Sequence, residues 1–186
     1  MAGEIDEAIE RADREAFTRR PPKTLKAQIG YLIRQLGSAK AVAREIGVTA
    51  DSVNRYRRGA RRHARPDIAA KIDDAVRQRW QPQVRKRRQK RAATTTGITV
   101  ETRARFGYSA PVGTTDDGRF RRLTVHLPPA YAQRLFDART TGAGDRQMRQ
   151  IIAEGFKEIY FQDGGSRATG LSDVTLNDID YLDLDY

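Results

Sequence analysis

The segment "SAKAVAREIGVTADSVNRYRRG", residues 38–59, carries the most specific structural pattern of the chain. Ser38 and Thr49 are residues that cap helix N-termini, and Gly47 and Gly59 are residues that end helices, so two short helices with one turn between them are predicted. A small residue at Ala43, four positions before Gly47, lets the helices cross closely. The apolar face of the pair consists of Val42, Ala43, Ile46, Val53 and Tyr56. The spacing therefore predicts a helix-turn-helix.

The outward face of the second predicted helix carries side chains of the kinds that contact DNA. They are Thr49, Ser52, Asn54, Arg55 and Arg58, with Asp51 beside them. Hydroxyl, amide and guanidinium groups form hydrogen bonds with phosphates and base edges. The alternative is an ordinary helical hairpin whose charged face is only solvated.

The positive charge of the chain is concentrated in one block. Residues 51–91 contain 15 basic and 4 acidic side chains, a surplus that equals the whole formal net charge of +11. A connector contributes Arg61, Arg62 and Arg65, and a predicted basic linker contributes Arg85, Lys86, Arg87, Arg88, Lys90 and Arg91. Such a block attracts a polyanion, and nucleic acid is favoured over a membrane because no lipid-anchoring amphipathic pattern accompanies it.

Composition excludes several kinds of site. The chain has no cysteine, which excludes disulfides and thiolate zinc sites, and two histidines, His63 and His126, are too few for a metal cage. The first residues, "MAGEIDEAIERADREAF", contain no apolar run, so neither a secretion signal nor a membrane span is predicted. We therefore expect a soluble, cytoplasmic protein without a structural metal.

The C-terminal half changes from helical to strand periodicity. Residues 98–108 alternate loosely and "RFRRLTVHLPP", residues 119–129, alternates cleanly between apolar and polar side chains. Two strands at these positions predict a β-hairpin whose long tip is residues 109–118.

Two helices are predicted after the hairpin. Pro128 and Pro129 begin the first, and Asp145 caps the second. Strand, helix and helix in this order are typical of a ribbon-helix-helix unit, in which residues 121–161 form a homodimer and present Arg122, Thr124 and His126 to DNA. The alternative is a hairpin packed on its own two helices.

The predicted fold class is mostly α (α+β), with an N-terminal helix-turn-helix bundle, a basic linker, and a C-terminal β-hairpin followed by two helices. The predicted parts are an N-terminal helix (1–20), a helix-turn-helix domain (21–83), the linker (84–97), the hairpin and two-helix domain (98–162) and an acidic tail (163–186). The end of the tail, "LSDVTLNDIDYLDLDY", alternates apolar and acidic residues. It is interpreted as a late strand, a partner-binding tail or an internal competitor for the basic block.

The chain resembles a known family over three segments, "RWQPQVRKRRQKRAATTTGITVETRARFGYSAPVGTTDDGR", "LTVHLPPAYAQRLFDA" and "AEGFKEIYFQDGG". The family is that of the telomere terminal proteins of linear, Streptomyces-type actinobacterial chromosomes and plasmids, and the resemblance extends from about Phe17 to the C-terminus. It implies a protein joined covalently to the 5′ end of linear DNA, which primes the synthesis that fills the recessed strand beside a 3′ overhang. The implied partners are telomeric DNA, a DNA polymerase and a telomere-associated protein.

The resemblance also implies which residue carries the link. A threonine of "VGTTDDGR" is the nucleotide acceptor in the family, and it corresponds to Thr114, with the neighbouring hydroxyl of Thr115 as the alternate. The first nucleotide is expected to be deoxycytidylate, and the helix-turn-helix of the family corresponds to residues 38–59. The chain itself is then a substrate without catalytic residues or a cofactor, because Mg²⁺ and the deoxynucleotide are supplied through the polymerase.

A priming hydroxyl needs an extended, open loop that can enter a polymerase cleft, and Gly113 and Gly118 give the tip that freedom. The basic residues that follow the tip, Arg119, Arg121 and Arg122, are expected to hold template phosphates. Asp116 and Asp117 either orient the hydroxyl near the polymerase metals or form a turn, for which "DDG" is typical.

Two other functions compete with this interpretation. A non-covalent transcriptional or partition regulator also suits a helix-turn-helix next to a ribbon-helix-helix pattern. A nicking or joining enzyme with its own hydroxyl nucleophile would need clustered histidines or carboxylates that the sequence does not suggest. The terminal-protein interpretation places the protein at DNA ends within the nucleoid.

Overall fold

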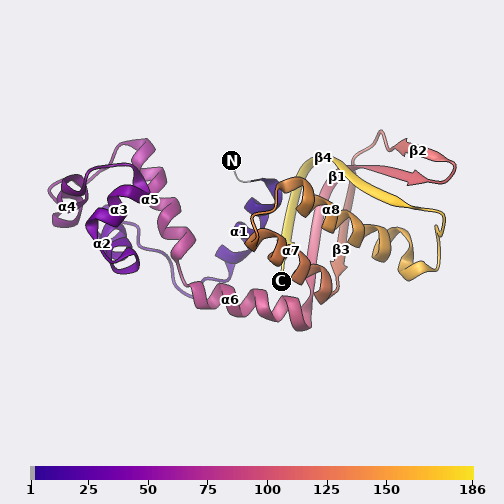
Figure 1. Cartoon of the computed structure of the whole chain (residues 1–186), viewed down its shortest axis with the longest axis horizontal. Coiled ribbons are helices and arrows are strands. Elements are labelled where there is room, and N and C mark those ends of the chain that lie inside the picture. Colours follow the sequence, from indigo (N-terminus) through magenta and orange to yellow (C-terminus); the bar gives the residue numbers. More distant parts are fainter. Residues whose placement is uncertain (1–2) are drawn as a thin grey trace. The chain divides into compact units, whose positions relative to one another are not determined.

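The computed structural model describes residues 3–186, which form two compact units. One unit is Phe17–Pro82, and the other combines the segment ending at Ala16 with Gln83–Tyr186. Figure 1 shows the helices and strands of both units. None of the helices in the described part of the chain is long and apolar enough to cross a lipid bilayer.

Four helices make up the Phe17–Pro82 unit: α2 (Leu25–Leu36), α3 (Ala39–Ile46), α4 (Ala50–Arg58) and α5 (Pro66–Arg79). The hydroxyls of Thr24, Ser38 and Thr49 accept hydrogen bonds from backbone N–H groups in the first turns of α2, α3 and α4. Gly37, Gly47 and Gly59 end the same three helices with positive φ. Local capping chemistry therefore sets the limits of these helices.

The apolar faces of the four helices meet in one core. Its buried side chains include Ile29, Leu32, Val42, Ile46, Val53, Tyr56, Ile72 and Val76. Trp80 packs edge-to-face on Tyr31, with ring centroids 5.0 Å apart, and its Nε1 donates to the Arg19 carbonyl oxygen at 2.9 Å. Trp80 is thus part of the structural core rather than an open stacking platform.

A four-stranded antiparallel sheet forms the centre of the second unit, and β1 (Ile98–Ala110) is its central strand. β4 (Asp173–Asp185) pairs along one side of β1. On the other side, β3 (Arg121–Leu127) pairs with residues 98–104 and β2 (Gly113–Asp116) with residues 107–110. After β2, the chain therefore continues along the same side of β1, where β3 pairs with its first half.

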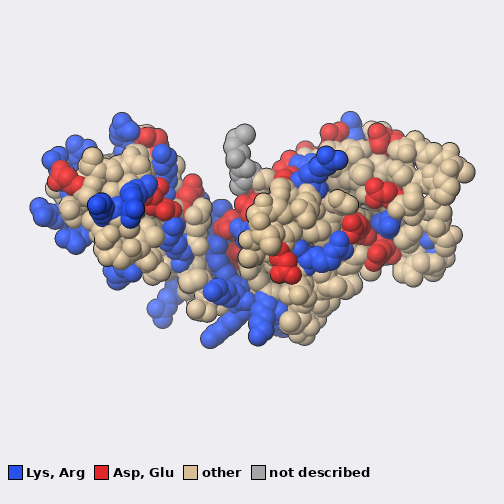
Figure 2. All heavy atoms as spheres, in the orientation of Figure 1, with Lys and Arg blue, Asp and Glu red and all other residues tan. Residues whose placement is uncertain are grey.

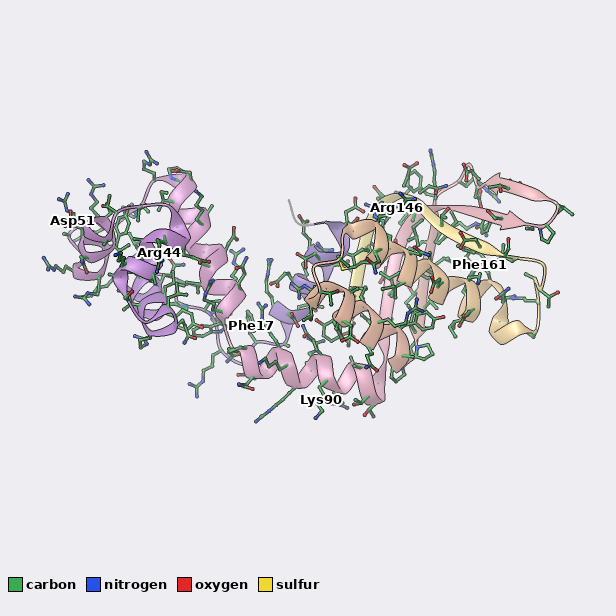
Figure 3. All side chains as sticks on the ribbon, in the orientation of Figure 1. Phe17, Arg44, Asp51, Lys90, Arg146 and Phe161 are labelled. Atoms are coloured by element: carbon green, nitrogen blue, oxygen red, sulfur yellow. The ribbon has the colours of Figure 1, made fainter. Side chains whose placement is uncertain are left out.

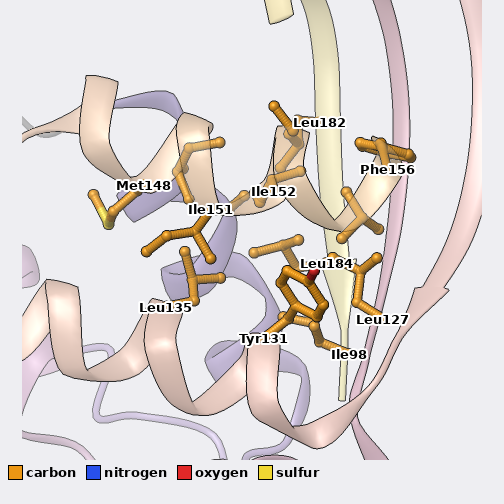
Figure 4. Packing of buried hydrophobic residues seen from close by; sticks show 14 of the residues in the cluster. Ile98, Leu127, Tyr131, Leu135, Met148, Ile151, Ile152, Phe156, Leu182 and Leu184 are labelled. Carbon is orange, nitrogen blue, oxygen red and sulfur yellow. The ribbon is translucent and has the colours of Figure 1, made fainter. Parts of the chain in front are cut away.

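Three helices cover one face of this sheet: α1 (Glu4–Glu15), α7 (Pro129–Thr140) and α8 (Asp145–Gly155). α8 is followed by a π-helical segment, η2 (Phe156–Phe161), and a short 3₁₀ turn, η3 (Asp163–Gly165). Even-numbered β1 residues point to this face and are buried from Ile98 to Phe106, whereas odd-numbered residues point to the other face. Figure 4 shows Leu135 and Ile152 of the helices packing with Phe156, Leu182 and Leu184.

The predicted fold class is wrong. Over residues 3–186 the structure contains eight α-helices and a four-stranded antiparallel sheet whose last strand is at the end of the chain. β3 is paired with β1 of the same chain, as in the intramolecular alternative, so the C-terminal part is not a ribbon-helix-helix. The N-terminal helix α1, which was predicted as a separate part, belongs to the unit that contains the sheet.

Two segments explain the error. The acidic end becomes β4 because Val174, Leu176, Leu182 and Leu184 are buried beneath the helices. The predicted basic linker becomes the helix α6 (Pro82–Arg91), followed by a π-helical turn, η1 (Ala92–Thr96). α6 is ordered by inward side chains: Arg85 contacts Glu10, and Gln89 donates to the Asp13 carboxylate, both on α1.

Candidate nucleic-acid interface and acceptor hairpin

The β1–β2 hairpin presents the two candidate acceptors in paired, extended backbone. Thr114 lies opposite Ser109, and Thr115 lies opposite Tyr108. Pro111 and Val112 form the apex, where the Val112 side chain is 99% exposed. Both threonines are exposed, so the hairpin holds its hydroxyls at the surface without burying them.

The two threonines face different surroundings because directly opposite residues of an antiparallel pair share one face of the sheet. Thr114 lies on the helix-free face, with its Oγ1 3.3 Å from the Ser109 Oγ. Thr115 lies on the face of Tyr108, whose ring contacts Phe161 with centroids 5.2 Å apart. Figure 3 labels Phe161 at the helix end near the hairpin. Thr114 is therefore the more openly approached of the two hydroxyls.

The carboxylates that follow the threonines have different partners. Asp116 accepts a hydrogen bond from Asn177 Nδ2 at 2.9 Å, and this contact fits only because Gly107 has no side chain there. Asp117 accepts from Arg121 Nε at 2.5 Å and from the Arg119 backbone N–H at 3.1 Å. These hydrogen bonds hold the pKa of the Asp117 carboxyl below its ordinary value. Asp117 thus has the turn-forming role, and Asp116 alone shares the face of Thr114.

The tip is thinly surrounded. Gly113 has a φ of +142°, a conformation that favours glycine, and a side chain added at Gly113 or at Gly118 would meet no atom within 4 Å. The space around Thr114 is therefore open to a large partner.

The helix-free face of the sheet, which carries Thr114, is largely neutralised by internal ion pairs. Arg103 binds Asp180 at 2.7 Å and Arg105 binds Asp178 at 3.3 Å, both across β1 and β4. The basic residues predicted to hold template phosphates are partly engaged as well. Arg122 binds Glu101 at 2.5 Å and Arg121 binds Asp117, whereas the Arg119 side chain is 85% exposed and its Nε lies 3.8 Å from Asp117. Arg119 is accordingly the most available cation beside the tip.

The predicted DNA-reading face of α4 is only partly free. The Thr49 hydroxyl is used as the helix cap, and Arg55 forms an ion pair with Asp51 at 2.8 Å. Ser52 and Asn54 are half-buried, whereas Arg58 is exposed. On α4 and in the connector, Arg57, Arg58, Arg61 and Arg62 are exposed and have no acidic partner among the described residues, while Arg65 binds Asp67 at 3.1 Å.

Helix α6 divides the basic run into an inner and an outer set. Arg85 is only 8% exposed and lies against Glu10 and Asp13, and Arg88 donates to Asp185 and to the Ala12 carbonyl oxygen. The outer set is Lys86, Arg87, Lys90 and Arg91, exposed residues for which residues 3–186 supply no acidic partner. Figure 2 shows the basic side chains gathered along α6, and Figure 3 labels Lys90 there. The outer set is the densest unpaired positive surface of this unit.

Sequence reasoning missed two residues of these surfaces, Arg57 and Asn177. Arg57 is four positions after the inward residue Val53, so helical periodicity placed it at the edge of the core, although it is exposed at the helix end. The sequence offers Ser109 as a competing hydroxyl but favours a strand end for it, and it lies in β1, opposite Thr114. Asn177 gave no signal, because its contact with Asp116 joins residues 61 positions apart.

Comparisons with known proteins give no match: no family model, no curated protein and no solved structure matches the chain significantly.

Proposed function

We propose that this chain is a protein primer of the telomere terminal protein type, which binds the ends of linear DNA and accepts the first nucleotide on Thr114. The observation that carries the proposal is the exposed Thr114 hydroxyl on a paired hairpin with an open tip. A hydroxyl presented this way can occupy the place of a primer 3′-OH, which a buried hydroxyl cannot. The resemblance of the segments around it supports the same assignment.

The proposed reaction transfers a nucleotidyl group. The Thr114 Oγ attacks the α-phosphorus of a deoxynucleoside triphosphate, expected to be dCTP, and forms a phosphodiester bond. The bond from the α-phosphorus to the oxygen bridging to the β-phosphate breaks, pyrophosphate leaves, and the hydroxyl proton passes to solvent. The polymerase supplies the Mg²⁺ ions that lower the pKa of the attacking hydroxyl and stabilise the leaving group.

Geometry favours Thr114 over Thr115. A polymerase approaching the Thr115 face meets the Tyr108 and Phe161 rings, whereas the Thr114 face offers the small Ser109 side chain and the Asp116 carboxylate. Asp116 is held by Asn177, so its position beside the acceptor is set before any partner binds.

The exposed cations support the DNA-binding part of the proposal. The outer set of α6 and the unpaired arginines of α4 and the connector are available to neutralise backbone phosphates. Most of these side chains have no competing acid, so DNA does not have to displace an internal ion pair. The proposed partners are the telomeric DNA end, a DNA polymerase and a telomere-associated protein.

A direct test looks for the covalent bond. The purified chain is incubated with a DNA polymerase, Mg²⁺ and one labelled deoxynucleotide at a time, then denatured and digested with protease. Mass spectrometry should find a nucleotidyl group on the peptide containing residues 112–119, with dCTP the preferred donor. A label carried only by peptides outside this hairpin would contradict the proposal.

The main alternative is the non-covalent regulator, favoured by the unpaired arginines of α4. It predicts that all DNA is released by denaturants and high salt. The test recovers the chain from cells and boils it in detergent. DNA that stays attached until nuclease removes it supports the primer, whereas DNA that is released by boiling supports the regulator.

A further inference from the structure

A cavity of about 640 Å³ lies at the end of α6, in the unit that contains the sheet. Its walls come from α6, the η1 turn, the first residues of β1, and the ends of β3 and β4. The side chains that line it and carry polar groups are Arg87, Arg88, Arg91, Thr96, Thr99, His126, Asp185 and Tyr186. The cavity lies away from the acceptor hairpin, at the opposite end of β1.

Two of its guanidinium groups are available to a ligand. Arg87 and Arg91 are four positions apart on α6, so their side chains lie on the same side of the helix. Both are exposed and have no acidic partner among residues 3–186. The acid in the cavity, Asp185, is already bound by Arg88 at 2.8 Å. The net positive charge of the cavity therefore comes from Arg87 and Arg91.

Neutral polar groups complete the lining. The Thr96 Oγ1 is buried and has no hydrogen-bond partner, which is rare for a buried hydroxyl. The Thr99 hydroxyl lies 3.1 Å from His126 Nδ1, which holds the imidazole against the same cavity. The Thr96 hydroxyl can donate a hydrogen bond to an anionic oxygen. So can either the His126 Nε2–H or the Thr99 hydroxyl, depending on which of these two residues donates in the hydrogen bond between them.

The backbone around Thr96 fixes the position of this buried hydroxyl beside the cavity. The π-helical turn closes with a hydrogen bond from the Gly97 N–H to the Ala92 carbonyl oxygen at 2.9 Å. Gly97 has a φ of +71°, and a side chain there would lie 2.2 Å from the Leu127 carbonyl oxygen and 3.0 Å from His126 Nε2. Only glycine lets β3 and His126 come this close to the turn.

We propose that this cavity binds a phosphate group, through the Arg87 and Arg91 guanidiniums, the Thr96 hydroxyl and the Thr99–His126 pair. Forked guanidinium groups match the oxygens of a phosphate, and the buried hydroxyl supplies the donor that such a ligand would satisfy. The nucleic-acid source of the phosphate rests on the proposed function: it is either a terminal monoester of a nucleotide or a backbone diester of DNA.

The test uses the imidazole of His126, which lines the cavity, as the probe of phosphate binding. The chain has two histidines, so the imidazole C–H signals of His126 and His63 can be followed separately by NMR. Inorganic phosphate is added at constant pH and ionic strength, with chloride as the balancing anion. The His126 signal should shift and saturate, whereas His63, in the other unit, reports weak non-specific binding.

Matched variants locate the binding. Arg87→Gln/Arg91→Gln should weaken phosphate binding at least about tenfold, because each charge-assisted hydrogen bond is worth about a factor of ten or more. Lys40→Gln/Arg44→Gln removes the same charge at the same spacing on α3 and should leave the titration unchanged. Thr96→Val keeps the shape of a side chain whose hydroxyl has no partner, so it should fold normally and still bind more weakly.

Two further ligands distinguish the source. Competition by deoxycytidine monophosphate indicates a terminal phosphate, and competition by a trinucleotide with a free 5′-hydroxyl indicates the backbone. The proposal is overturned if His126 shows no saturable shift, if the Arg87→Gln/Arg91→Gln variant binds phosphate as the wild type does, or if neither nucleotide ligand competes. Thr114 labelling is measured on the same variants, so a failure of this site is distinguished from a failure of the priming function.

Discussion

Thr114 and Thr115 are neighbours in the chain, yet their side chains lie on opposite faces of the β1–β2 hairpin, across from Ser109 and Tyr108 respectively. The two hydroxyls are chemically identical, so any difference between them as acceptors has to come from this geometry.

Replacing either threonine by valine tests that difference. Valine keeps the branched shape that suits an exposed strand and removes only the hydroxyl. Thr114→Val should abolish nucleotidylation by the polymerase, Thr115→Val should retain most of it, and Thr114→Ser should retain part of it. Circular dichroism should show the same folded signal for all three. Full labelling of Thr114→Val would assign the acceptor elsewhere.

The outer set of α6 should determine the salt dependence of DNA binding in this unit. Each neutralised phosphate contributes about −0.9 to the log–log slope on duplex DNA, so Lys86→Gln/Lys90→Gln should reduce the slope by about two. Arg134→Gln/Arg146→Gln removes the same charge from α7 and α8 and serves as the control. Binding is measured by fluorescence anisotropy between 50 and roughly 200 mM salt, the range over which such contacts lose most affinity. Equal slopes for the two variants would show that α6 does not contact DNA.

The stability of the chain in acid should depend on the Glu10 carboxylate, which is paired with Arg85 of α6 and Arg139 of α7. Burial raises the pKa of the Glu10 carboxyl, but the hydrogen bond from Arg139 and the charges of Arg85 and Arg139 outweigh it and hold the pKa below the ordinary 4.5. The folded pKa is lower than the unfolded one, so the unfolded chain binds more protons as the pH falls. The stabilisation is therefore complete above pH 4.5 and is lost as the pH falls through the folded pKa.

The corresponding variant is Glu10→Gln. It leaves two arginines in a largely buried site with less negative charge, so the free energy of unfolding at pH 7 should fall by about 2 to 3 kcal/mol. The difference between wild type and variant should shrink below pH 4.5, as measured by urea unfolding at a series of pH values. A difference that stays constant from pH 7 to acid would contradict the role given to this carboxylate.

The strand β4 should contribute to stability through its apolar residues rather than its charges. Leu182 is 3% exposed beneath the helices, so Leu182→Ala should lower the free energy of unfolding by about 2 to 4 kcal/mol. Asp180→Asn removes an exposed ion pair with Arg103 and should cost less than about 1 kcal/mol. Chemical denaturation followed by circular dichroism compares the two. A larger effect of Asp180→Asn would mean that the acidic side chains hold the strand.

Much of the local structure could be predicted because it depends on residues a few positions apart. Ser38 and Thr49 cap α3 and α4, and Gly47 and Gly59 end them, as the sequence pattern predicts. The strand alternation of residues 121–127 is likewise present in β3. These features need only helix capping and side-chain periodicity, which act within one or two turns or one strand.

The errors concern segments whose structure depends on distant partners. The acidic end of the chain becomes a strand because its leucines pack beneath helices and its aspartates meet arginines about 75 residues earlier, such as Arg103 with Asp180. The basic run becomes α6 because Arg85 meets Glu10, 75 residues earlier in the sequence. No local pattern contains these pairings, so composition alone suggested a linker and a tail.

The sequence by itself determined that the chain is strongly basic, that Ser38, Thr49 and the glycines after them limit two helices, and that two adjacent threonines lie between two glycines. Only the tertiary structure decided which of those hydroxyls has the open face and which basic residues remain unpaired, because both depend on strand register and on acids supplied from far along the chain. Capping and periodicity act between near neighbours, whereas the availability of a charge or a hydroxyl is set by whatever folds against it.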